Sequence, residues 1–415
     1  MLIQIAGLIL LAVVAVILII DIIPLWKDWF GRIHIGRASD KEKWGESITE
    51  LAVKWLNHTP TIKLTDHTRL IVIDMLRGNY SRSSIQHWQE AALLLGTSEY
   101  LKHHDDKKVE QAVVKYLEKT FDHNGQWREK PKHVDGAILA YALMKLSFVE
   151  TDRYKEALDY TWAMIKEYIG EDGTVEYRKS MNHYRYVDTV GFICPFLVAY
   201  GLRYEEDACI DLSIKQILTY ERYGMLTNHG IPCHAYLIDH KVPMGLYGWG
   251  RGLGWYAIGL IDAWYELPTE HPYKSELKHC ISRFAKAAIR FQQPSGNWNW
   301  TVTRQESIPD SSSTATVGWF MQQAASIPAL ADECSASAER AIHYLMKVTR
   351  RNGAIDFSQG DTKDIGVYSN QFGILPFTQG FGVRLIQRYN AARKSGKQEY
   401  AAKKEGLNES KELAH

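Results

Sequence analysis

The stretch Asn124-Gly125-Gln126-Trp127 decides the fold, because variants of it recur along the chain. Each variant combines a turn dipeptide, whose Gly suits a positive φ, with a short alternation of polar and apolar residues. The further copies are Asp172-Gly173-Thr174-Val175, Ser295-Gly296-Asn297-Trp298 and Asn352-Gly353-Ala354-Ile355, with a weaker copy at Tyr223-Gly224-Met225. Successive glycines lie 48, 51, 72 and 57 residues apart, so the chain repeats one unit and enlarges it once.

Helical patterns flank these turns. Apolar residues at helical spacing, as in Ala137, Ala140 and Leu143, precede or follow each copy. Pairs of helices that recur about every 50 residues predict stacked αα-hairpins, arranged as a closed toroid or as an open solenoid. Small apolar stretches such as 252–255 and 314–318 favour closure, because they begin helices that need burial on most sides.

Inner helices of the toroid are expected near residues 43–58, 84–97, 135–148, 188–203, 251–266, 312–327 and 372–390. That makes six or seven such helices. The chain is therefore predicted to be all-α, with one six-hairpin (α/α)6 barrel over residues 36–392. The segment 393–415 is rich in Lys, Glu, Ser and Ala, which predicts a disordered tail.

The segment 1–26 is predicted to be a transmembrane anchor. Residues 2–25 are almost unbroken hydrocarbon, and a helix of ~20 residues spans a bilayer. No basic stretch precedes this segment and no small-residue cleavage pattern follows it, which argues against a signal peptide. Basic residues follow it at Lys27, Arg32 and Arg37. The positive-inside rule then predicts a single-pass protein of the inner membrane with its catalytic domain in the cytoplasm.

The composition of the chain limits the kinds of molecule that it is expected to bind. The net charge is +1 and no Lys/Arg-dense stretch is interleaved with aromatic residues, so a nucleic-acid partner is not expected. The five cysteines are scattered without a CxxC pair, and no metal-ligand spacing occurs. We therefore expect no metal and no other cofactor. The chain has 13 Trp and 23 Tyr, many in polar-aromatic clusters that suit a sugar-binding groove, although aromatic residues also fill cores.

Four predicted inner helices begin with polar residues that would meet at one mouth of the barrel. Their starts read His133-Val134-Asp135-Gly136, Tyr186-Val187-Asp188-Thr189, Trp249-Gly250-Arg251-Gly252 and Pro309-Asp310-Ser311-Ser312. An aspartate at such a place is often only an N-cap, worth roughly 0.5–2 kcal/mol. The Trp, His and Arg residues nearby favour a substrate-binding or catalytic site over a simple N-cap. Two carboxylates across a groove suit glycosidic acid–base chemistry, so Asp188 and Asp135 are the catalytic candidates.

The stretch from Trp249 to Ala257, WGRGLGWYA, resembles the W-[AG]-R-G-N-G-W-Y-A signature of the unsaturated uronyl hydrolases, glycoside hydrolase families 88 and 105. Asp188 with the Pro195-Phe196-Leu197 that follows it, and the stretches 310–315 and 376–380, are similar to further segments of these families. Asp135 falls where their first conserved aspartate lies. Two positions depart from the pattern: Leu253 stands in place of Asn, and Ser313 in place of Gly.

This resemblance implies the (α/α)6 barrel and a hydrolase that removes a 4,5-unsaturated uronic acid from the non-reducing end of an acidic oligosaccharide. The reaction would be hydration of the enol ether. Asp188 would protonate C4 and then act as base on the water that adds at C5, while Asp135 would hold water or the sugar hydroxyls. The residues expected to bind substrate are Arg251, Trp255, His234, Trp249, His133 and Ser312.

Two other functions fit the same sequence. One is a related barrel enzyme that hydrolyses a saturated glycosidic link. The other is a non-catalytic polysaccharide-binding or assembly component, anchored in the membrane beside a synthase.

Overall fold

The structure is a computed structural model of the chain, and it describes residues 1–60, 62–63, 66–78, 80–81 and 86–412. The chain is mostly helical. In chain order the α-helices are α1 (Leu2–Arg32), α2 (Lys41–Asn57), α3 (Ile71–Leu76), α4 (His87–Leu101), α5 (Lys107–Thr120), α6 (Gly136–Met144), α7 (Lys155–Glu167), α8 (Val187–Tyr204), α9 (Asp207–Tyr223), α10 (Gly250–Glu266), α11 (Tyr273–Phe291), α12 (Ser311–Ala324), α13 (Ala331–Lys347) and α14 (Pro376–Glu412). Short 3-10 turns lie at Thr151–Tyr154, Lys179–Met181 and Pro328–Leu330.

The strands are short and antiparallel, and they lie in the connections between helices. β3 (Tyr184–Tyr186), β6 (Ala235–Leu237) and β7 (Val242–Met244) form a three-stranded sheet in the order β3-β6-β7. The remaining strands form two-stranded pairs: β1 (Ile62–Lys63) with β2 (Tyr80–Ser81), β4 (Met225–Leu226) with β5 (Ile231–Pro232), and β8 (Ser358–Gln359) with β9 (Phe372–Gly373).

Six helices form a closed inner ring. Within the described residues α4, α6, α8, α10, α12 and α14 contact one another in this order, and α14 packs against α4 to complete the ring. The helices α2, α5, α7, α9, α11 and α13 lie outside it, each against one or two inner helices. Every residue of α12 is buried, as expected for a helix that is covered on all sides. The ring is a toroid and not an open solenoid.

Glycines allow the ring to close. At the seam between α14 and α4, a Cβ on Gly380 would overlap the carbonyl of Ala92, and a Cβ on Gly96 would overlap the carbonyl of Gly380. Backbone cannot move aside as the end of a flexible side chain can. Both positions therefore require the absence of a side chain if the first and last inner helices are to touch.

One predicted inner helix is an outer helix. The prediction for 43–58 was wrong because α2 packs with only one side, on α4, α5 and α14. Its buried residues Trp44, Ile48, Ala52 and Trp55 form a single stripe. The opposite side is exposed, so the structure has six inner helices in the part of the chain that it describes.

The repeated turns have the backbone that the sequence predicts. Gly125, Gly173, Gly296 and Gly353 all adopt positive φ, between 70° and 97°. Three of the turns are closed by an antiparallel bridge between residues six apart, namely Phe121 with Trp127, Ile169 with Val175, and Thr349 with Ile355. The weaker copy differs, because Gly224 has a φ of −97° and ends α9.

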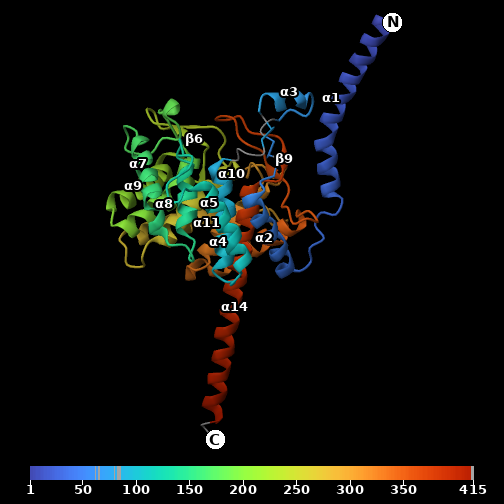
Figure 1. The fold of residues 1–415 in the computed structure, drawn as a ribbon. Coiled ribbons are helices and arrows are strands. Elements are labelled where there is room, and N and C mark those ends of the chain that lie inside the picture. The colour runs from blue at the N-terminus through green and yellow to red at the C-terminus, as the bar shows by residue number, and fades with distance from the viewer. Residues whose placement is uncertain (61, 64–65, 79, 82–85, 413–415) are drawn as a thin grey trace.

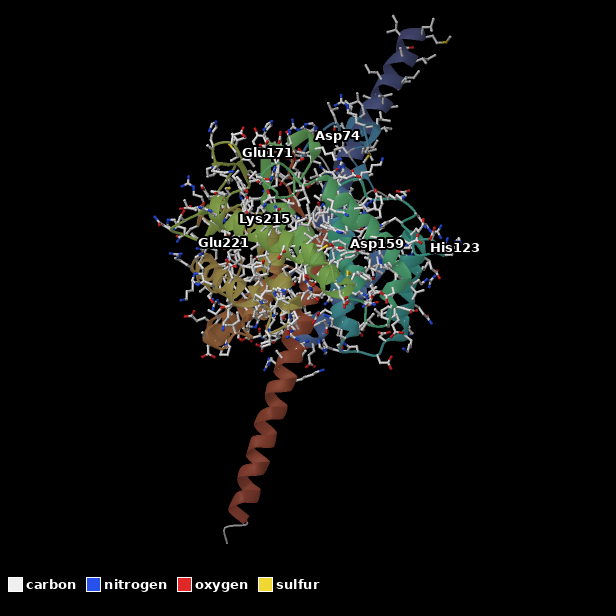
Figure 2. The ribbon with its side chains drawn as sticks, turned by 90° about the vertical axis from the view of Figure 1, so that its left-hand side faces the viewer. Asp74, His123, Asp159, Glu171, Lys215 and Glu221 are labelled. Carbon is white, nitrogen blue, oxygen red and sulfur yellow. The ribbon has the colours of Figure 1, made fainter. Side chains whose placement is uncertain are left out.

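The N-terminal helix α1 lies largely outside the barrel, and the end of α14 projects on the opposite side (Figures 1 and 2). By length and composition α1 could cross a membrane, and a signal sequence near an N-terminus meets the same criteria. The segment predicted as a disordered tail from 393 onward continues α14 as a helix to Glu412.

We predict that Gly380→Ala opens the seam and lowers the free energy of unfolding by about 1–3 kcal/mol, the usual effect of overpacking. Thermal denaturation measures this change. The matched control is Gly373→Ala, because Gly373 has open space where a Cβ would stand and no positive φ. A Gly380→Ala protein as stable as the Gly373→Ala protein would contradict this account of closure.

Candidate active site

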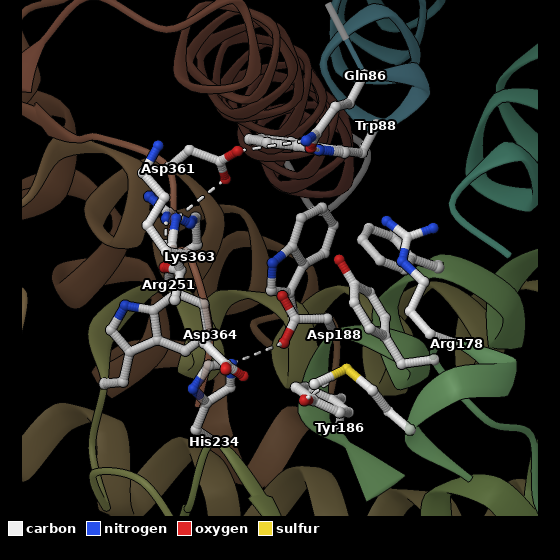
Figure 3. Close-up of a pocket in the computed structure, with 16 residues that line it drawn as sticks. Gln86, Trp88, Arg178, Tyr186, Asp188, His234, Arg251, Asp361, Lys363 and Asp364 are labelled. Atoms are coloured by element: carbon white, nitrogen blue, oxygen red, sulfur yellow. Dashed lines mark hydrogen bonds and ion pairs between the residues drawn. The ribbon is translucent and has the colours of Figure 1, made fainter. Parts of the chain in front are cut away.

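A cavity of about 350 Å³ opens where α4, α8 and α10 begin (Figure 3). A turn before β3 and a loop after β8 complete its walls. The lining residues are Gln86, Trp88, Tyr177, Arg178, Met181, Tyr186, Asp188, Phe192, His234, Trp249, Arg251, Trp255, Asp361, Thr362, Lys363 and Asp364. The cavity thus combines aromatic faces with charges of both signs, which suits a polar, ring-shaped ligand.

Asp188 lies at the centre of the cavity, in the first turn of α8. The pairing of β3 with β6 sets Tyr186 opposite Ala235, and the backbone N–H of Val187 donates to the carbonyl of His234. This ladder brings the His234 ring to Asp188, with Nε2 3.8 Å from Oδ2. Oδ2 is buried and accepts no hydrogen bond from the described residues. Asp188 therefore does not act as an N-cap.

Burial decides the protonation of this pair. Desolvation raises the pKa of Asp188 to about 7, although the positive charge of Arg251 opposes the shift. Desolvation also lowers the pKa of His234 to about 4, so the imidazole is neutral near pH 7. The sequence leaves open whether the helix dipole or burial dominates at Asp188. In the structure burial dominates, and the carboxyl group can carry a proton near neutral pH.

Asp135 precedes α6 and is not among the residues that line the cavity. Its side chain makes no capping hydrogen bond. Burial raises its pKa, with His87 and Arg178 acting in the opposite direction. Burial raises the pKa of Tyr177, and the negative charges of Asp188 and Asp135 raise it further, which indicates that Tyr177 lies near both carboxylates. Asp135 is thus a carboxylate that caps no helix and lies close to the cavity.

Arg251 is bound by the protein itself. Its guanidinium donates to the carbonyls of Gln359 and Gly360, at 2.7 and 2.8 Å, and to Oγ1 of Thr362, at 3.0 Å. The side chain of Trp249 donates to Oε1 of Gln359 at 2.9 Å. Both residues at the start of α10 therefore hold the segment 359–362, which forms one wall of the cavity. The sequence predicts Arg251 as a substrate ligand. Arg251 does line the cavity, and these contacts also make it hold the wall in place.

Two cations that the sequence analysis missed face the cavity. Arg178 stacks over Tyr177 at 4.7 Å, and its Nη1 is buried without a hydrogen-bond acceptor among the described residues. Lys363 lies in the loop after β8 with an exposed side chain. Neither residue begins an inner helix, where sequence reasoning placed the site. The signal available for Arg178 was its position shortly after the repeated turn at Gly173.

Among the other predicted site residues, Trp255 lines the cavity and packs against Trp88, Phe192 and Phe377. His133 is exposed and outside the cavity, with its Nδ1 3.2 Å from the hydroxyl of Tyr168. Trp255 therefore lies in the wall of the cavity, and His133 does not.

Ser312 was predicted to bind substrate, but its position in the structure does not allow this. It is fully buried, and its hydroxyl donates to Asp310, the carboxylate that caps α12. A substrate in the cavity does not reach it.

Comparison with known proteins agrees with this architecture. The chain is a glycoside hydrolase. It belongs to Glycosyl Hydrolase Family 88, whose model matches residues 63–371. Similar solved structures include a possible member of glycoside hydrolase family 105 from Salmonella enterica serovar Paratyphi A (TM-score 0.72, 16% identity, 84% of this chain and 94% of that one). Another is the unsaturated glucuronyl hydrolase from Bacillus sp. GL1 (TM-score 0.62, 14% identity, 83% and 94%). These neighbours have an (α/α)6 barrel, as this chain does.

The buried carboxyl of Asp188 predicts how stability depends on pH. The pKa of Asp188 is about 7 in the folded protein and 3.8 ordinarily. Below pH 3.8 the carboxyl group is protonated in both the folded and the unfolded state, so its ionisation does not affect stability. As pH rises from 3.8 toward 7, only the unfolded state ionises freely, and the folded protein becomes progressively less stable. Asp188→Asn removes this cost. We expect the variant to match the wild type near pH 4 and to exceed it by a few kcal/mol at pH 8. Melting temperatures across this range measure the difference, and an Asn variant that is less stable throughout would indicate a cap.

Proposed function

We propose that this glycosidase removes a 4,5-unsaturated uronic acid from the non-reducing end of an acidic oligosaccharide by hydrating the enol ether. One observation carries the proposal. Asp188 stands in the cavity with a pKa of about 7, and one of its oxygens accepts no hydrogen bond from the described residues. Near neutral pH such a group is a proton donor and, once ionised, a base.

The steps use that one group twice. The carboxylic acid of Asp188 gives its proton to C4, and the positive charge that develops at C5 is shared with the ring oxygen. Water adds at C5 while the Asp188 carboxylate accepts one of its protons, which restores the acid. The resulting hemiketal opens by cleavage of the bond from C5 to the ring oxygen. The hemiacetal left at C1 then releases the aglycone as an alcohol, and one water is consumed overall.

Neighbouring groups suit the two stages. His234 is neutral near pH 7 and its Nδ1 is buried without a partner among the described residues, so the ring can accept or donate one hydrogen bond to water or sugar. Asp135 would orient hydroxyls or water from the side of Tyr177. Trp249 and Trp255 line the cavity but are only 2% and 1% exposed, so they shape its wall.

Arg178 is the best partner for the carboxylate of the substrate. Its Nη1 has no acceptor among the described residues, and a guanidinium can bond both oxygens of a carboxylate. The guanidinium of Arg251 already donates to three acceptors of the protein. Lys363 adds a second positive charge at the mouth.

A purely structural or assembly role is less well supported. A carboxyl group with a buried oxygen that accepts no hydrogen bond from the described residues destabilises the fold, and a scaffold has no use for that cost. Hydrolysis of a saturated link needs two carboxyl groups on either side of the bond. Asp135, the second carboxylate predicted for this task, does not line the cavity. Asp361 and Asp364 do line it, but only Asp188 has an oxygen that is buried there and accepts no hydrogen bond from the described residues.

We also propose that α1 anchors the enzyme in the inner membrane, as a single-pass protein with a cytoplasmic barrel. Trp26 and Trp29 are both 62% exposed near the barrel end of α1, where interfacial tryptophans are common. Basic residues follow at Lys27 and Arg32.

The test is to supply lyase-generated oligosaccharides and to follow the loss of ultraviolet absorbance of the conjugated uronate. We expect turnover by the wild type and a fall of ~10²–10⁴-fold in Asp188→Asn, with substrate binding largely retained. Because Asp188 must donate a proton, kcat/KM should fall as pH rises above about 7. An Asp188→Asn protein with unchanged turnover would disprove the mechanism.

The two arginines predict opposite phenotypes. Arg178→Ala should raise KM at least ~10-fold and change the melting temperature little, because Nη1 of Arg178 has no acceptor among the described residues. Arg251→Ala should lower the melting temperature, because the segment 359–362 loses its three donors. Steady-state kinetics and thermal denaturation of both variants measure the contrast. An unstable Arg178→Ala, or a fully stable Arg251→Ala, would show that the two roles are assigned wrongly.

A further inference from the structure

A second cavity, of about 760 Å³, lies between the barrel and the end of α1 nearest to it. We call it the α1 cleft. Its apolar side chains come from α1, from α3 and from β9, and include Ile20, Ile23, Leu25, Ile71, Met75 and Phe372. Charged residues, among them Lys27, Asp28 and Asp66, also line the cleft. An apolar wall of this extent beside a carbohydrate site is unexpected, because a free oligosaccharide offers it no hydrocarbon chain to bury.

The α1 cleft adjoins the candidate active site at one loop. Asp361 and Lys363 line both cavities. They belong to the loop that Arg251 holds through Gly360 and Thr362. A ligand in the active site could therefore extend past this loop into the cleft.

The walls of the α1 cleft are attached to one another. The carboxylate of Asp21 accepts the backbone N–H groups of Leu70 and Ile71, each at 2.8 Å, which joins α1 to the start of α3. At the other end of the cleft, Arg350 donates to Asp28 at 2.7 Å. Side chains of opposite charge and backbone donors thus fix α1 at this distance from the barrel.

The cleft begins where the apolar stretch of α1 ends. Side chains earlier in the helix face outward, as Leu8 and Leu11 do at 67% and 68% exposure. Asp21, the first charged residue of α1, stands beside Ile20 and Ile23 of the cleft. With α1 in a bilayer, the cleft opens at the level where hydrocarbon meets water.

We infer that the substrate is a membrane-borne glycolipid, whose unsaturated uronyl end enters the active site while the first part of its hydrocarbon chain lies in the α1 cleft. This inference rests on the proposed function and on the proposed anchor. It adds the aglycone class: a lipid-linked acidic oligosaccharide in place of a free one.

The test compares two glycosides of one unsaturated uronyl-glucose disaccharide, with an octyl or a methyl aglycone. The full chain is used in phosphatidylcholine nanodiscs. The wild type should favour the octyl glycoside at least about tenfold in kcat/KM, since each buried methylene adds to the transfer free energy. Met75→Asp places a charge in the cleft and should abolish the preference while leaving the rate on the methyl glycoside unchanged.

Neighbouring residues supply the controls. Leu76 is 85% exposed and does not line the cleft, so Leu76→Asp should keep the octyl preference. Ile23→Asn and Ile22→Asn form a second pair, because Ile23 lines the cleft and Ile22 does not. Octyl glycosides also partition into the bilayer, but partition is the same for all variants. A preference that survives both Met75→Asp and Ile23→Asn overturns the inference.

Failure of the two proposals can be told apart. Equal kcat/KM for both glycosides in the wild type overturns the glycolipid and leaves the uronyl hydrolase standing. If neither glycoside is hydrolysed, the proposed reaction fails. Calorimetric binding to the Asp188→Asn protein then tests the cleft alone, and octyl and methyl glycosides that bind equally would overturn it.

Discussion

The close contact of Gly380 with the backbone of Ala92 joins the last inner helix to the first, and the position of every site residue depends on that closure. A closed ring gives the inner helices two common ends. The starts of α4, α8 and α10 meet at one of them, so residues far apart in sequence share a cavity. Closure also removes water from the inner faces. The desolvation that raises the pKa of Asp188 is a consequence of this packing, reinforced by the β3–β6 ladder beside it.

A second set of contacts connects α1 to the wall of the site. Burial would raise the pKa of Asp356, but hydrogen bonds from Arg32 and Arg350 outweigh it and keep the carboxylate ionised. Asp356 directly precedes the segment that carries β8 and the loop held by Arg251. The N-terminal helix and one wall of the active site therefore share a buried charge cluster.

Local patterns in the sequence predicted the parts of the structure that local physics determines. The turn glycines were found because positive φ needs Gly. Asp188 was expected in a cavity because a carboxylate at a helix start stood among aromatic residues, and it does line one. Features that depend on residues far away in the sequence were not predicted. The stretch that became α2 looked like an inner helix because periodicity does not show how many sides are covered. The hold of Arg251 on the loop was not foreseen because its three acceptors lie more than a hundred residues away. Arg178 was overlooked because it begins no inner helix.

The central claim is that burial makes Asp188 a proton donor near neutral pH. The most direct measurement is an infrared difference titration of wild type against Asp188→Asn, which isolates the carbonyl stretch of the protonated carboxyl group. Our account predicts that this band persists through mildly acidic pH and disappears with a midpoint of about 7. A midpoint near the ordinary value of 3.8 would mean that the carboxylate is solvated or paired, and would contradict the proposed chemistry.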